Sequence, residues 1–148
     1  MSLLASIDST GFRFMMLLHI LAVVIGFAPA WLTPFLLRLA NNGDKNAAAS
    51  LESSVLRLSL PGIGLAGVFG FGLAGMSDKT YKMSQAWLSI AVALWLILLV
   101  LIVVVERPAI KAYASGNTAA RGKVMAIAGV THLILVAMLY LMIFKPGL

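Results

Sequence analysis

The chain of 148 residues contains no cysteine, and only 11% of its residues are Asp, Glu, Lys or Arg. Without cysteine there are no disulfides, thiolate metal ligands or thiol nucleophiles. Soluble domains are about 25% charged and about 45–50% apolar, whereas 61% of this chain is hydrophobic. So little polar surface places the chain in a lipid bilayer, which excludes the common soluble enzyme folds.

The few charges separate four long uncharged segments. A charge near mid-bilayer costs about 2.5–3.5 kcal/mol on insertion scales, and a spanning helix needs about 20 apolar residues. Four segments meet both conditions: 14–37, 58–77, 83–105 and 124–144. They predict an all-α membrane protein, a four-transmembrane-helix bundle forming one domain over residues 1–148. The Glu106-Arg107-Pro108 sequence is expected to end the third span and begin a connection to Lys123.

The basic residues are divided unequally between the two ends of the predicted bundle. Four crossings put both termini beside the connection between the second and third spans, with four basic residues: Arg13, Lys79, Lys82 and Lys145. The other end has seven: Arg38, Lys45, Arg57, Arg107, Lys111, Arg121 and Lys123. The positive-inside rule therefore predicts that both termini lie outside the cell. This distribution also explains the net charge of +6 without a nucleic-acid partner.

Glycine is concentrated in the second span. The Gly62-Ile63-Gly64-Leu65-Ala66-Gly67 sequence matches the dinucleotide-binding pattern, but that pattern needs a preceding strand and a soluble helix, so we exclude nucleotide binding. Four small residues at intervals of four form a ridge: Gly62, Ala66, Gly70 and Ala74. Such a ridge favours close helix packing, and it alternatively leaves a slot for a flat ligand.

His19 and His132 are the only ionisable side chains within the predicted spans. A histidine inside a membrane is a functional hypothesis, and its neutral ring suits an axial ligand of haem iron or a copper ligand. The alternative is a structural histidine hydrogen-bonded between helices. His19 lies about 7–8 Å and His132 about 18 Å from the outer ends of their spans. This difference in depth argues against both rings binding one iron.

Methionine supplies a second kind of candidate ligand. Met15 lies four residues before His19, and Met138 is predicted to be nearly level with His19. Thioether sulfur and imidazole together suit copper(I) or a haem with His and Met ligands. Methionine also commonly fills gaps in apolar cores.

The segment 12–38, with its Leu-Leu-His19-Ile-Leu sequence and a second half rich in Gly, Pro, Trp and Leu, resembles the first helix of an uncharacterised family of small bacterial membrane proteins with four helices. That family is distantly similar to copper-resistance D proteins and membrane-embedded protoporphyrinogen oxidases. The Glu106-Arg107-Pro108 sequence fits the same resemblance. It implies the bacterial cytoplasmic membrane and a first-helix histidine, here His19, near haem, porphyrin or copper, with Arg38 closing the helix. The oxidases also use a deeper lysine, and 83–105 contains none, which argues against porphyrinogen oxidation.

Together these features predict a protein that binds haem b in a redox or porphyrin-handling role. His19 is the first candidate ligand and His132 the second, and Gly70 belongs to the small-residue face. Arg38 or Arg57 is expected to pair with a propionate at the inner boundary. Two alternatives stay open. One is a cofactor-free accessory subunit whose small-residue ridge packs against a membrane partner or a second copy. The other is a copper protein with Met15 and Met138 among its ligands.

Overall fold

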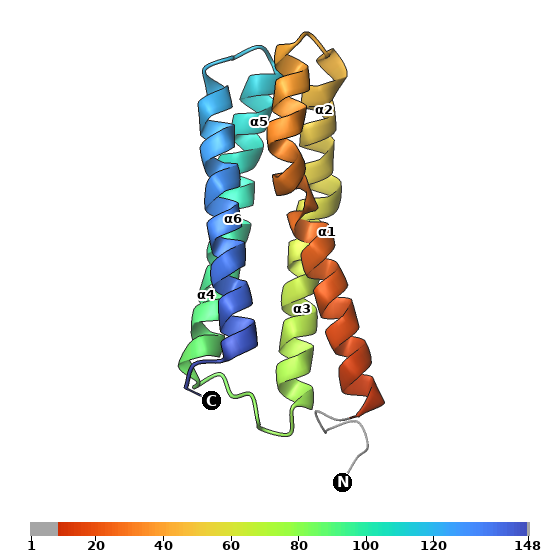
Figure 1. Cartoon of the computed structure of the whole chain (residues 1–148), viewed down its shortest axis with the longest axis vertical. Coiled ribbons are helices and arrows are strands. Elements are labelled where there is room, and N and C mark those ends of the chain that lie inside the picture. The colour runs from red at the N-terminus through yellow and green to blue at the C-terminus, as the bar shows by residue number, and fades with distance from the viewer. Residues whose placement is uncertain (1–8, 148) are drawn as a thin grey trace.

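The computed structural model describes residues 9–147, apart from the side chain of Lys45, and this part of the chain is helical with no strand. Four helical rods run alternately in opposite directions (Figure 1). In chain order they consist of α1 (Thr10–Asn41); α2 (Lys45–Ser54), η1 (Val55–Ser59) and α3 (Leu60–Met76); α4 (Ala86–Val100), η2 (Leu101–Glu106) and α5 (Arg107–Ala114); and α6 (Ala120–Phe144). Each rod is long and apolar enough to cross a membrane. The predicted four-helix membrane bundle is confirmed.

The third rod differs most from its predicted span. The helix does not end at Glu106 but continues to Ala114, so the connection to α6 is only residues 115–119. The predicted turn at Glu106-Arg107-Pro108 is therefore wrong. Glu106 lies inside the helix and is 3% exposed.

Two π-helical segments explain why prolines do not end these rods. η1 lies just before Pro61 and η2 just before Pro108. Immediately after each segment a backbone N–H donates to the carbonyl five residues earlier, from Leu60 to Val55 and from Arg107 to Ile102. Proline removes a helical donor and its ring clashes with the carbonyl four residues before it. A local π turn re-satisfies the backbone groups, so the helix passes the proline.

The first half of the small-residue ridge makes the closest contact between rods. A Cβ built on Gly62 would lie 2.6 Å from the Cα and N atoms of Gly26 in α1. Gly62 and Ala66 are both buried. The close-packing interpretation therefore holds for this half of the ridge, which α1 covers within the same chain.

The bundle is packed unequally along its length. Near the α1–α2 and α5–α6 connections, large apolar side chains fill the core, among them Leu37, Leu51, Ile102, Ile110 and Val124. The opposite half has a smaller cluster of Trp87, Leu88, Ala91 and Leu141. The outer surface exposes many large apolar side chains along the rods, as a lipid environment requires.

α1 begins and α6 ends at the same end of the bundle, which also carries the α3–α4 connection (Figure 1). This agrees with an even number of crossings. The terminal residues 1–8 and 148 lie outside the described part of the chain. Their location outside the cell stays a prediction from the charge distribution.

Candidate functional site

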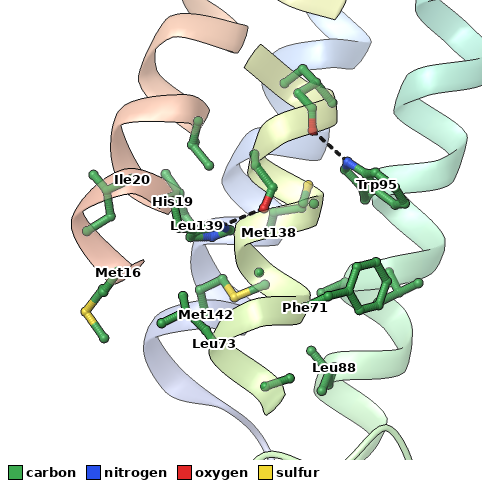
Figure 2. A pocket seen from close by; sticks show the side chains of 18 of the residues that line it. Met16, His19, Ile20, Phe71, Leu73, Leu88, Trp95, Met138, Leu139 and Met142 are labelled. Carbon is green, nitrogen blue, oxygen red and sulfur yellow. Dashed lines mark hydrogen bonds between the residues drawn. The ribbon is translucent and has the colours of Figure 1, made fainter. Parts of the chain in front are cut away.

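An apolar cavity of about 520 Å³ lies in the loosely packed half of the bundle (Figure 2). All four rods contribute to its wall, and the residues that matter for ligand chemistry are Met16, His19, Gly70, Trp95, Met138 and Lys145. Its size is within the range of about 300–1,000 Å³ found for ligand pockets. Because the wall is aromatic and aliphatic with few polar groups, it suits a lipid-soluble ligand.

His19 supplies the imidazole of this cavity. The side chain projects from the middle of the first half of α1, and Nδ1 lies 2.8 Å from the backbone oxygen of Ala66 in α3. A carbonyl oxygen only accepts, so Nδ1 carries the hydrogen and the neutral ring keeps a lone pair on Nε2. Histidines that bind metals usually donate their other N–H to a carbonyl or carboxylate in this way. The contact therefore fixes both the tautomer and the orientation of the ring.

The His19 ring packs against the second half of the small-residue ridge. A Cβ on Gly70 would lie 3.3 Å from Cε1 and 3.5 Å from Nδ1 of His19. Gly70 and Ala74 both line the cavity. The first half of the ridge thus packs against the α1 backbone, whereas the second half contacts the His19 ring and lines the cavity.

The predicted methionines do not converge on the histidine. Met138 lines the cavity with Met16 and Met142, although Figure 2 shows the exposed Met16 side chain directed away from His19. Met15 packs instead against Gly72, where a Cβ would lie 3.3 Å from the methionine sulfur. Of the two methionines singled out in the sequence, the structure places only Met138 in the same cavity as His19.

His132 lies elsewhere in the bundle. Its Nδ1 is 2.6 Å from the backbone oxygen of Ala128, one turn earlier in α6. Its ring meets Trp31 edge-on, with centroids 4.2 Å apart. Trp31 follows His19 by twelve residues, about 18 Å along α1. The structure therefore does not bring the two histidines to one ligand.

Arg38 is also distant from the cavity. It is exposed in the last turn of α1 and follows His19 by nineteen residues, about 28 Å at the helical rise. Across residues 9–147, no cluster of three or more His, Asp or Glu side chains could hold a metal ion.

Two tryptophans that the sequence did not single out as site residues shape the cavity. The Nε1–H of Trp95 donates to the backbone oxygen of Ile63 at 2.8 Å, and its ring lies against Gly67. Trp87 is 2% exposed, and its ring meets Tyr81 edge-on with centroids 5.5 Å apart. A polar aromatic in the middle of an apolar span was the available signal for Trp95, because a buried indole N–H needs an acceptor.

The cavity also contains one lysine. Lys145 ends α6 in a left-handed backbone conformation, with φ 41° and ψ 57°. Its Nζ lies 5.3 Å from the centroid of the Tyr81 ring, which is within cation–π range. The sequence placed this lysine only as a charge that bounds the fourth span.

Comparisons of this chain with protein-family models, with curated proteins and with solved structures found no match.

Proposed function

We propose that this multi-pass membrane protein binds haem b in the cavity, with His19 as an axial ligand, in a redox or porphyrin-handling role. The observation that carries the proposal is the hydrogen bond from His19 Nδ1–H to Ala66. It leaves the Nε2 lone pair available on a ring that lines an apolar cavity.

The surroundings of His19 fit a flat macrocycle. On the α3 side the cavity is lined by the small residues Gly70 and Ala74. The aromatic and aliphatic side chains of the other walls offer dispersion contacts to a porphyrin. A single imidazole is enough from the protein because the porphyrin brings four nitrogen ligands of its own. If haem is bound, the thioethers of Met138 and Met142, which line the same cavity, are candidates for a second protein ligand.

Bound haem iron would supply one-electron chemistry, and the chain's residues set its conditions. His19 holds and orients the group, while the hydrogen bond to Ala66 raises the basicity of the ring. The apolar wall excludes water and lowers the local dielectric, which tunes the reduction potential. The resemblance of 12–38 to helices expected near haem or copper supports the same site.

Optical spectroscopy of the purified protein tests this proposal. We expect the wild type, produced with haem precursors and purified in detergent, to show a Soret band that shifts on reduction. His19→Ala should lose the band. His132→Ala is the matched control and should keep it, because His132 does not line the cavity.

A wild type without a Soret band, or a His19→Ala protein with an unchanged band, would overturn the proposal. The same sample distinguishes the alternatives. Stoichiometric copper without a Soret band favours the Met and His copper site, since Met138 and His19 share the cavity. A stable partner that co-purifies without any chromophore favours the accessory subunit.

A further inference from the structure

Among the described residues that line the cavity, one carries a charged side chain. Lys145 belongs to that wall, and it is half-buried. His19 also lines the cavity, and its neutral ring donates Nδ1–H to the Ala66 carbonyl. The neutral imidazole does not add a second positive charge. Among the side chains described, Nζ has the Tyr81 ring as its partner and no carboxylate.

The helix α6 ends just before Lys145, where the backbone changes direction. Lys145 takes a left-handed conformation, and its backbone N–H donates to the carbonyl of Leu141 at 3.0 Å. The ammonium group then lies over Tyr81 from the α3–α4 connection. The end of α6 and the α3–α4 connection, which lie at the same end of the bundle (Figure 1), thus hold the cation at the cavity wall.

The distances along the bundle favour Lys145 over Arg38 as the partner of an acidic ligand. His19 follows Thr10, the first residue of α1, by nine residues, about 14 Å from the same end. Lys145 lies at that end and lines the cavity, with its Nζ beside the Tyr81 ring. Arg38 lies in the last turn of α1, beyond the packed half of the core.

We propose that Lys145, held over Tyr81, is the binding site for a carboxylate of the cavity's ligand. The ligand class is then an apolar ring system with an acidic edge, bound with its carboxylate toward the termini and its ring toward His19. This inference rests on the proposed function and deepens it, because the haem propionates are such carboxylates. The attraction between an ammonium and a carboxylate is stronger at a half-buried site than between the same two groups in water.

Metal-free porphyrins separate this inference from iron ligation. The full chain in lipid nanodiscs is titrated with protoporphyrin IX and with its dimethyl ester, and porphyrin fluorescence is corrected with empty nanodiscs. We expect the wild type to bind the free acid about tenfold more tightly than the ester, the scale of one charge-assisted hydrogen bond. Lys145→Gln should abolish this preference, whereas Lys145→Arg should retain it.

Lys82→Gln is the matched control for charge. Lys82 is an exposed cation at the same end of the bundle and does not line the cavity, so its variant should keep the tenfold preference. A wild type without preference for the acid, or a Lys145→Gln protein that keeps the preference, would overturn the inference.

The His19→Ala variant distinguishes the two proposals. It should lose the haem Soret band yet still prefer the free acid of the metal-free porphyrin. Acid preference in a wild type that shows no Soret band would support Lys145 as the carboxylate site and refute iron ligation. Failure of the wild type to bind either porphyrin would overturn both.

Discussion

The closest contact in the bundle gives a sharp test of how α1 and α3 are held together. In Gly62→Ala the new Cβ would lie 2.6 Å from two backbone atoms of Gly26 and 3.1 Å from the oxygen of Ala22. Carbon atoms in contact are normally about 3.5–4.0 Å apart. Backbone atoms cannot rotate aside, so the two helices must separate by about 1 Å.

The size of the effect follows from two opposing terms. Overpacking typically costs about 1–3 kcal/mol, and contact with backbone places Gly62→Ala near the upper value. Alanine in place of glycine inside a helix gains about 1 kcal/mol. We therefore expect Gly62→Ala to lower the free energy of unfolding by about 2 kcal/mol, the difference between these terms.

Gly64→Ala is the matched control in the same helix, because nothing lies within 4 Å of its new Cβ. It should raise the free energy of unfolding by about 1 kcal/mol through helix propensity alone. Unfolding of both variants in sodium dodecyl sulfate, followed by circular dichroism, measures the difference of about 3 kcal/mol expected from these terms. A Gly62→Ala protein as stable as Gly64→Ala would refute the packing argument.

Two further predictions concern buried polar contacts. Gly67→Ala places a Cβ against the Trp95 ring and should break the indole hydrogen bond to Ile63. We expect the free energy of unfolding to fall by about 1–2 kcal/mol, and this loss should largely disappear in a Trp95→Phe background. Equal losses in both backgrounds would contradict the coupling of Gly67 to Trp95. Glu106 is 3% exposed, and no described side chain forms an ion pair or hydrogen bond with it. Because burying an unpaired charge is costly, Glu106→Gln should raise the free energy of unfolding by about 1 kcal/mol or more, and a lower value in the same assay would show that the charge stabilises the fold.

The candidate site was only partly accessible to sequence reasoning. His19, Gly70 and Met138 share a cavity, and residue type and helical spacing had drawn attention to all three. His132 and Arg38 were singled out by the same reasoning but lie about 18 Å and about 28 Å along the bundle from His19. Residue type identifies a possible ligand, but the position of the ligand along a rod and the face it occupies depend on how the rods pack.

The third rod shows a different limit of the sequence. A charge next to proline is typical of a helix end, and Glu106-Arg107-Pro108 was interpreted in that way. The π turn at η2 lets the helix continue through Pro108. That turn buries Glu106 in a bundle where Ile102 and Ile110 pack around neighbouring positions. Tertiary packing therefore overrode a local signal.

The sequence by itself determined the four membrane helices and the alternation of their directions. The physical reason is that the cost of placing a charge in lipid is a local property, set by the charges that separate the apolar segments. The tertiary structure decided which helices pack against each other and which side chains meet in the cavity. Packing at Gly26 and Gly62 joins α1 to α3, the Ala66 carbonyl orients His19, and Lys145 returns over Tyr81. Each of these contacts joins residues distant in sequence, so no local pattern specified it.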